Sequence, residues 1–291
     1  MKILFISGGD NIDYQADCLF VGLREMFGAE VVDANKHHHA YFSHPEAACR
    51  QMYGMGMSVT RLLDDIEVDR TDIEAKIRAR YFDLIVFGSI FRNVDFLELV
   101  IGNYPADKII AVDGEDHERI NMLALDFGML YFKRELSTVQ DSVLPISFAM
   151  PTSRFSPSFF NKTRDFSICD PRDRSTYIYK DEASYYGGYK EARLAVTTKK
   201  SGWDCMRHYE IIANGALPVF IDVDACPAAT MVSYEKALCK QIIDDLAGKM
   251  SPSDIYEKHA WAMFSHAIVH NTTKALGEYL VNSWFKARAQ R

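Results

Sequence analysis

The 291-residue sequence lacks the features of membrane, disulfide-rich and nucleic-acid-binding proteins. No apolar run approaches the roughly 20 residues that a membrane-spanning helix needs, and residues 2–6 resemble a short strand rather than a signal sequence. The six cysteines are dispersed without a C-x-x-C pair, which argues against a zinc cluster or disulfide framework and favours a reducing compartment. The net charge of −7 disfavours general binding to nucleic acid or to an anionic membrane. We therefore expect a soluble, cytoplasmic protein.

Strand-like and helix-like segments alternate along the first half. Buried apolar runs at 2–7, 30–33, 83–88, 108–113, 129–133 and 144–148 predict a parallel sheet, with helices at 14–27, in part of 61–80 and at 96–101. Proline, serine and threonine near 150–163 predict a linker. The second half predicts a compact α/β unit of four or five strands, followed by a helical tract over 252–288. We therefore predict an N-terminal domain over 1–152, a C-terminal domain over 153–270, and a helix over 271–291 that returns to the N-terminal domain.

The most informative stretch spans residues 199–220. A strand at 193–198 leads into a Ser201-Gly202 turn, a helix that ends at Gly215, and a second buried strand. A helix N-terminus after a strand presents free N–H groups and partial positive charge, which suits a phosphate. At helical spacing, Trp203, Arg207 and Glu210 share one face. This pattern predicts a nucleotide-diphosphate site; the alternative is an amphipathic surface helix capped by Ser201.

The same stretch resembles the donor-binding motif of GT-B glycosyltransferases, in particular the exostosin-like and group 1 branches. It contains Ser-Gly-Trp-Asp, then a basic residue, a Glu three residues later, and Ala-x-Gly-x-x-Pro-Val. The resemblance implies an α/β fold of two Rossmann-like, doubly wound domains that face each other across a cleft, with the donor on the C-terminal domain. It also implies that the turn and Arg207 meet the diphosphate and that Glu210 bonds the ribose. The predicted donor-binding residues are Lys199, Lys200, Ser201, Gly202, Trp203, Arg207, Glu210 and Asp222.

An inverting sugar transfer needs a base that takes the proton of the acceptor hydroxyl. The loop after the first strand is one source: Gly8 and Gly9 allow close approach of the backbone to a ligand, and Asp10 and Asp13 follow. Asp13 is our first candidate for the base, although it is equally suited to cap the helix that starts at 14.

The loop at 113–119 is the second source of a base, because it gathers several acids and a histidine at the end of a strand. Crowded acids raise each other's pKa values, which helps one of them act as a base. Asp116 is the second candidate and His117 the third. The alternative is a solvated loop in which Asp116 caps the next helix.

Other residues have weaker signals. Lys133 and Arg134 end a predicted strand and are candidates to line the cleft and offset phosphate charge, or form a surface pair. Three consecutive histidines, 37–39, point in different directions unless the backbone turns sharply, so we expect a structural or acceptor-facing role and no metal site. Aromatic rings stack on bases and sugars, so one of five clustered tyrosines could hold the nucleobase, unless they only pack the domain. These are Tyr177, Tyr179, Tyr185, Tyr186 and Tyr189.

The predicted activity is transfer of a sugar from a nucleotide-sugar, UDP- or GDP-linked, to a hydroxyl of a glycan or small acceptor. The resemblance implies inversion and independence of metal, with no cofactor beyond the nucleotide-sugar co-substrate. Two alternatives stay open. One is a non-catalytic module that binds a nucleotide-sugar or glycan. The other is a nucleotide-dependent α/β enzyme of the epimerase or dehydrogenase type, although Ser7-Gly8-Gly9-Asp10 lacks the G-x-G-x-x-G spacing of a dinucleotide turn.

Overall fold

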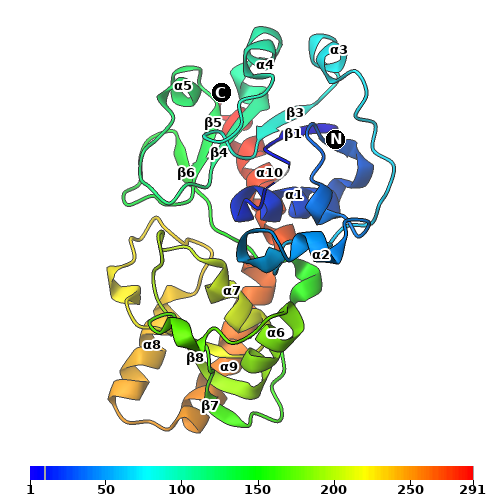
Figure 1. Cartoon of the computed structure of the whole chain (residues 1–291). Coiled ribbons are helices and arrows are strands. Elements are labelled where there is room, and N and C mark those ends of the chain that lie inside the picture. The colour runs from blue at the N-terminus through cyan, green and yellow to red at the C-terminus, as the bar shows by residue number, and fades with distance from the viewer. Residues whose placement is uncertain (10, 291) are drawn as a thin grey trace.

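The computed structural model describes residues 1–9 and 11–290 and contains two parallel β-sheets. The N-terminal half forms a six-stranded sheet, and the C-terminal half forms a three-stranded sheet that lies below it in Figure 1. The mixed α/β class predicted from the alternating segments is therefore confirmed. The order of the larger sheet is β2-β1-β3-β4-β5-β6, with β1 at Ile3–Ile6, β2 at Val31–Asp33, β3 at Leu84–Phe87, β4 at Ile109–Asp113, β5 at Leu130–Lys133 and β6 at Val143–Pro145.

Helices cover both faces of the six-stranded sheet, which explains why its strands are continuous apolar runs. On one face the strands share a core with α1 (Tyr14–Phe27) and α10 (Thr273–Ala289). On the other face they share a core with α3 (Ile73–Arg78), α4 (Leu97–Asn103) and α5 (Met122–Asp126). The strand order reverses between β1 and β3. Ligands of such doubly wound sheets bind beyond the carboxyl ends of the strands, at this kind of reversal.

The three-stranded sheet has the order β7-β8-β9. Among the described residues it has three strands where four or five were predicted, because the chain after β9 forms a short 3-10 turn and a loop through Pro227 that leads directly to α8. Its elements are β7 (Arg164–Phe166), α6 (Glu182–Glu191), β8 (Ala192–Thr197), α7 (Met206–Ala213), β9 (Leu217–Phe220), α8 (Lys236–Ala247) and α9 (Pro252–His270).

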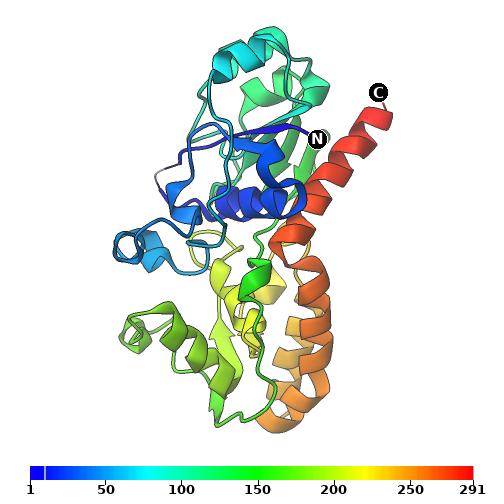
Figure 2. The same cartoon turned by 90° about the vertical axis from the view of Figure 1, so that its right-hand side faces the viewer.

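The last helical tract consists of two helices, α9 and α10, where one tract was predicted. Asn271 and Thr272 separate them, and the Thr272 side chain caps α10 by accepting a hydrogen bond from Ala275 N. Figure 2 shows α9 beside the three-stranded sheet and α10 beside the six-stranded sheet. Within the described part of the chain, no helix combines the length and the hydropathy needed to cross a membrane.

Helices α1 and α10 cross in close contact at a pair of glycines. A Cβ on Gly22 would lie 1.9 Å from the Thr273 carbonyl oxygen, and a Cβ on Gly277 would lie 3.1 Å from the Gly22 carbonyl carbon. Trp284 and Arg288 extend this contact, because Trp284 Nε1 donates to the Asp107 carbonyl at 2.6 Å and Arg288 Nε donates to the Asp107 carboxylate at 3.0 Å. The end of the chain is therefore bound to the N-terminal half.

We predict that Gly22→Ala lowers the free energy of unfolding by about 1–3 kcal/mol, because the added methyl group forces α1 and α10 apart. Gly102→Ala is the matched control: Gly102 also lies in a helix, but its Cβ would have no neighbour within 4 Å. Equilibrium denaturant unfolding of both variants measures the effect. Equal stability of the two variants would contradict the close crossing.

Candidate functional site

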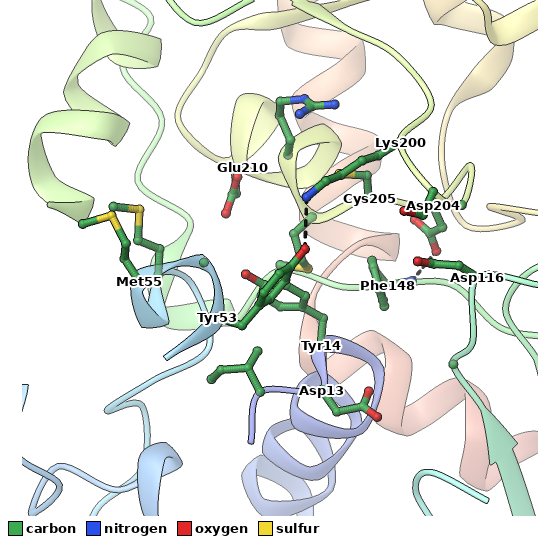
Figure 3. A pocket seen from close by; sticks show the side chains of 18 of the residues that line it. Asp13, Tyr14, Tyr53, Met55, Asp116, Phe148, Lys200, Asp204, Cys205 and Glu210 are labelled. Carbon is green, nitrogen blue, oxygen red and sulfur yellow. Dashed lines mark hydrogen bonds between the residues drawn. The ribbon is translucent and has the colours of Figure 1, made fainter. Parts of the chain in front are cut away.

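A pocket of about 710 Å³ lies between the two sheets and draws its walls from both. Its residues follow the carboxyl ends of β1, β3, β4, β5 and β6 in one sheet and of β7 and β8 in the other. Figure 3 shows side chains of both halves around it. The predicted site residues that line it are Asp13, Asp116, Arg134, Lys200, Ser201, Gly202, Arg207 and Glu210.

Arg207, on the first turn of α7, is a cation without a carboxylate partner. Its Nε donates to Thr197 Oγ1 at 3.1 Å, its Nη2 to the Thr198 carbonyl at 3.1 Å, and its Nη1 to the Tyr177 hydroxyl at 3.0 Å. These contacts use three of the five N–H groups of a guanidinium, and Arg207 forms no ion pair with any described residue. The residue is only 7% exposed. A buried charge is costly unless it is paired, so the guanidinium favours an anion in the pocket.

Lys200 is a second cation without a carboxylate partner among the described residues. Its Nζ donates to the Tyr53 hydroxyl at 3.0 Å, and this hydrogen bond raises the pKa of Lys200. The Lys200 N–H donates to the Gly202 carbonyl at 3.0 Å and closes the turn at 200–202. Lys200 and Arg207 therefore come from the segment after β8 and from α7, while Arg92 and Arg134 line the pocket from the six-stranded half.

Glu210 lies one helical turn beyond Arg207 and is bonded on both carboxylate oxygens. One oxygen accepts a hydrogen bond from Ser58 Oγ and the other accepts from the Tyr185 hydroxyl at 2.9 Å. Burial raises the pKa of Glu210. A carboxylate has about four acceptor positions, so two remain for a ligand. Ser58 was not predicted, and nothing in its local sequence indicates that it reaches α7.

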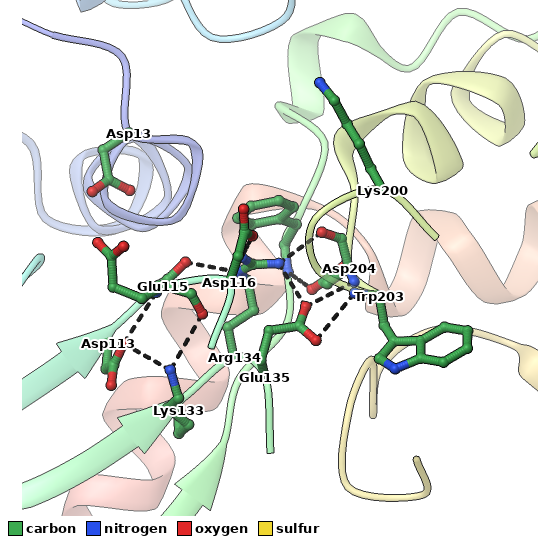
Figure 4. Close-up of polar contacts among 12 residues, drawn as sticks. Asp13, Asp113, Glu115, Asp116, Lys133, Arg134, Glu135, Lys200, Trp203 and Asp204 are labelled. Carbon is green, nitrogen blue, oxygen red and sulfur yellow. Dashed lines mark hydrogen bonds and ion pairs between the residues drawn. The ribbon is translucent and has the colours of Figure 1, made fainter. Parts of the chain in front are cut away.

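Arg134 and Glu135, directly after β5, bind the loop that precedes α7 (Figure 4). The Glu135 carboxylate accepts hydrogen bonds from the backbone N–H groups of Trp203 at 3.1 Å and Asp204 at 2.9 Å. Arg134 Nη1 donates to Glu135 Oε1 at 2.8 Å and to the Asp204 carbonyl at 2.7 Å. Both side chains are buried. We call Arg134, Glu135 and Asp204 the clamp.

The Asp204 side chain completes the clamp. Its carboxylate accepts from the Phe148 N–H at 2.6 Å and from the Tyr209 hydroxyl at 2.8 Å, and burial raises the pKa of Asp204 to about 6. The bond to Phe148 also explains why β6 ends at Pro145, where a strand through residue 148 was predicted.

The prediction that a helix directly follows the turn at 201–202 is wrong. Trp203 and Asp204 lie in a non-helical loop that Glu135 binds through their N–H groups, and α7 begins at Met206. Ser201 does not cap the helix; Cys205 stands at that position without a side-chain hydrogen bond. Trp203 therefore leaves the helical face that it was predicted to share with Arg207 and Glu210.

Asp13 and Asp116 line the pocket from the six-stranded sheet, and each is paired with an arginine that also lines it: Asp13 with Arg92 at 3.3 Å, and Asp116 with Arg134. Asp13 Oδ1 caps α1 by accepting from Ala16 N at 3.2 Å, and Oδ2 accepts from Ser89 Oγ at 2.6 Å. Asp13 therefore has the capping role of the alternative interpretation and also faces the pocket. Asp116, whose side chain is 54% exposed, accepts a hydrogen bond from Arg134 Nη2.

Some predicted residues do not line the pocket. The Lys133 Nζ is fully buried and donates to Asp113 Oδ1 at 2.9 Å, and burial lowers the pKa of Lys133. His117 packs edge-to-face on Phe91, with ring centroids 5.3 Å apart. The prediction that Lys133 lines the cleft is therefore wrong, and His117 does not line the pocket either.

The remaining corrections concern two loops. Gly8 and Gly9 lie outside the pocket, and a Cβ on Gly9 would meet the Lys36 carbonyl oxygen at 2.5 Å, so Gly9 serves loop packing. The neighbouring Asp10 lies outside the described residues. In the other loop, Lys199, Trp203 and Asp222 do not line the pocket. Lys199 Nζ lies 4.7 Å from the Trp203 ring centroid, and Asp222 accepts from Thr198 Oγ1 at 2.6 Å.

The tyrosine cluster is divided between the pocket and the core. Tyr177, Tyr179 and Tyr185 line the pocket, whereas Tyr186 and Tyr189 are buried in the packing of the domain. The three predicted tyrosines that line the pocket lie on the same side as Arg207 and Glu210. They form the aromatic part of this wall.

The three histidines do not line the pocket. His37 Nε2 lies 2.6 Å from Ser7 Oγ, and His39 Nε2 lies 2.9 Å from Asp17 Oδ1, both in the interior. Burial lowers the pKa of His37 to about 4. The residues that the structure describes include no group of three or more His, Cys, Asp or Glu side chains placed to hold a metal ion.

Comparison with known proteins does not identify a family. No protein-family model matches the chain, and no curated protein matches it. What the pocket can do follows from its own groups. Lys200 and Arg207, which form no ion pair with a described residue, lie on one side, and Asp13 and Asp116, each paired with an arginine, lie on the other.

We predict that Glu135→Gln lowers the free energy of unfolding by about 1.5–3 kcal/mol, because an amide replaces a buried carboxylate that accepts hydrogen bonds from two N–H groups. The amide protons of Trp203 and Asp204 should also exchange faster. Denaturant unfolding and amide hydrogen exchange measure both effects. Glu98→Gln, at an exposed position of α4, is the control. Unchanged exchange at residues 203 and 204 would contradict the assigned role of Glu135.

Proposed function

We propose that the protein is a glycosyltransferase of GT-B type, which transfers a sugar from a nucleoside diphosphate sugar to a hydroxyl group. The observation that carries the proposal is the buried Arg207 guanidinium, which faces the pocket without a carboxylate partner among the described residues. The GT-B arrangement, two doubly wound domains across a cleft, is supported by a pocket whose walls come from strand ends of both sheets.

In this proposal the diphosphate binds at Arg207, Lys200 and the turn at 200–202. Guanidinium and ammonium groups form charge-assisted hydrogen bonds with phosphate oxygens, which are stronger than neutral ones. Gly202 lets this turn lie directly against the clamp, since a Cβ there would collide with Glu135 Oε1. The nucleoside then lies along the aromatic wall, where Tyr177, Tyr179 or Tyr185 stacks on the base and Glu210 accepts from the ribose hydroxyls.

The acceptor hydroxyl approaches from the six-stranded sheet, where Asp13 and Asp116 lie. One carboxylate takes the hydroxyl proton while the oxygen attacks the anomeric carbon. The bond between that carbon and the diphosphate oxygen breaks, and the diphosphate leaves with the electron pair. Arg207 and Lys200 stabilise the negative charge that develops on the leaving group. Two cations serve this purpose without a metal ion, as the family resemblance implies.

The alternative of a non-catalytic binding module makes a different prediction. Such a module needs the cations but not the acids. The presence of both Asp13 and Asp116 in the same pocket as Arg207 favours the enzyme. Turnover of acid variants that still bind nucleotide separates the two.

We predict that Lys200→Ala weakens binding of the preferred nucleoside diphosphate about tenfold, the loss of about 1.4 kcal/mol from one charge-assisted contact. Lys199→Ala is the matched control, because the neighbouring lysine stacks on Trp203 and does not line the pocket. Calorimetric titrations with UDP, GDP, ADP and CMP, with and without EDTA, measure the affinities. Equal losses in both variants, or no binding of any nucleotide by folded protein, would count against the proposal.

We predict that substituting the base reduces kcat by about 100- to 10,000-fold while nucleotide affinity is retained. Asp116→Asn and Asp13→Asn test the two candidates, and asparagine at position 13 keeps the helix cap because Asn caps as well as Asp. Glu118→Gln, exposed in the same loop as Asp116, is the control. Release of the nucleoside diphosphate from the nucleotide-sugar is the readout. Full turnover in both asparagine variants would rule out both as the base.

A further inference from the structure

The acceptor side of the pocket has an apolar wall that the sequence did not indicate. Tyr14 follows β1, Phe148 follows β6, and Tyr53, Met55 and Met57 belong to a loop before α3. Figure 3 shows Tyr53 and Tyr14 between Lys200 and Asp13, Met55 on the side of Glu210, and Phe148 beside Asp204, whose carboxylate accepts from the Phe148 N–H. The cations Lys200 and Arg207 come from the opposite half of the chain. The pocket therefore has an apolar, aromatic wall beside its ionic groups.

The methionine loop, residues 53–58, adopts rarely populated backbone angles that a hydrogen bond from outside the loop holds in place. Gly54, Met55, Gly56 and Ser58 all have positive φ, between 57° and 74°. Non-glycine residues rarely adopt this region, and it persists only where the surroundings enforce it, often at functional sites. Here the Ser58 N–H donates to Glu182 Oε1 at 2.7 Å. The shape of the loop is therefore fixed from the C-terminal half.

The loop that carries the two methionines lies against an aromatic ring of the pocket. A Cβ on Gly54 would lie 2.3 Å from the Tyr14 hydroxyl, so the loop lies directly on that ring. Tyr14 packs edge-to-face with Tyr53 and with Phe148, each at a centroid separation of 6.1 Å. Tyr53 remains 62% exposed. A further planar ring could extend this set, because aromatic rings favour such offset and edge-to-face contacts and methionine sulfur contacts ring edges favourably.

The Tyr14 hydroxyl adds a polar group to this wall. It has no hydrogen-bond partner in the described part of the chain, and burial raises the pKa of Tyr14 above its usual range, so it keeps its proton. It lines the same pocket as Asp13, the next residue toward the N-terminus. An acceptor on this wall thus meets ring faces, two thioethers, a phenolic donor and a carboxylate.

We propose that the acceptor carries an aromatic ring, which binds against Tyr14, Tyr53, Met55 and Met57 with its hydroxyl-bearing part beside Asp13 and Asp116. The inference rests on the proposed function and names the acceptor class for it. A purely polar sugar would leave Met55, Met57 and Ile12 in contact with hydroxyl groups that they cannot bond, whereas an aryl group buries all three.

Three glycosides that differ only in the aglycone test the proposal: phenyl, cyclohexyl and methyl β-D-glucoside. Each is titrated into the full chain with and without the saturating nucleoside diphosphate, and affinity is measured by calorimetry or saturation-transfer NMR. We expect phenyl glucoside to bind at least tenfold more tightly than methyl glucoside and more tightly than cyclohexyl glucoside. Phenyl glucoside that fails to bind, or binds no more tightly than either of the others, overturns the proposal.

A double substitution locates the binding site of the phenyl group. Met55→Ala with Met57→Ala should weaken phenyl glucoside binding at least fivefold and leave the affinity for methyl glucoside unchanged. Met52→Ala is the matched control, because Met52 precedes the same loop but does not line the pocket. Unfolding temperature confirms that the variants are folded. An unchanged phenyl preference in the double variant overturns the assignment to this wall.

The failures of the two proposals are distinguishable. Nucleotide affinity is read separately from glucoside affinity, and the methionine variants leave Lys200 and Arg207, which bind the diphosphate in our assignment, unchanged. Absence of nucleotide binding with a clear phenyl preference refutes the transferase and keeps the aromatic site. Intact nucleotide binding without a phenyl preference refutes the aromatic acceptor alone.

Discussion

The Glu135 carboxylate, buried between the two sheets, accepts hydrogen bonds from two consecutive backbone N–H groups at Trp203 and Asp204. The same carboxylate neutralises Arg134, which itself donates to the Asp204 carbonyl. A buried carboxylate and guanidinium satisfy each other's charge only if both stay in place. The clamp therefore fixes the loop after β8 against the loop after β5. It also sets the start of α7, and so the position of Arg207 and Glu210 in the pocket.

With the clamp in place, the pocket divides its chemistry between the two halves of the chain. The segments after β7 and β8, with α6 and α7, supply Lys200, Arg207, Glu210 and the tyrosine wall. The loops of the six-stranded sheet supply Asp13 and Asp116, each paired with an arginine, and the apolar wall. Reactions that expel a charged group gain from this separation, because the cations face the leaving group and the acids face the nucleophile. Helix α10 packs against α1, the helix that Asp13 caps, so the chain end supports the acidic side. The packing of α10 on α1, the clamp and the pocket are thus structurally connected.

The sequence predicted the α/β class and the approximate position of every strand in the first half, and both are confirmed because buried strands are apolar runs. Eight of the candidate site residues line one pocket, because strand ends collect at one edge of a sheet. The predicted start of α7 was wrong: Trp203 lies in a loop whose backbone is bound by a distant carboxylate, Glu135, and α7 begins at Met206. The placement of Lys133 at the cleft was wrong because residue type does not reveal the direction of a side chain at a strand end. The Lys133 side chain is buried against Asp113. The methionine loop was missed because its shape depends on Ser58 and Glu182, 124 residues apart.

The most direct test of the account is a crystal structure of the chain grown with a saturating nucleoside diphosphate. The account predicts diphosphate oxygens within hydrogen-bond distance of the Arg207 guanidinium and the Lys200 ammonium, with the base beside Tyr177, Tyr179 or Tyr185. It also predicts an unoccupied space between the diphosphate and the two aspartates, where the acceptor would bind. A nucleotide bound elsewhere on the molecule, or a diphosphate on the side of Asp13 and Asp116, would contradict the central claim that the segment after β8 is the donor site.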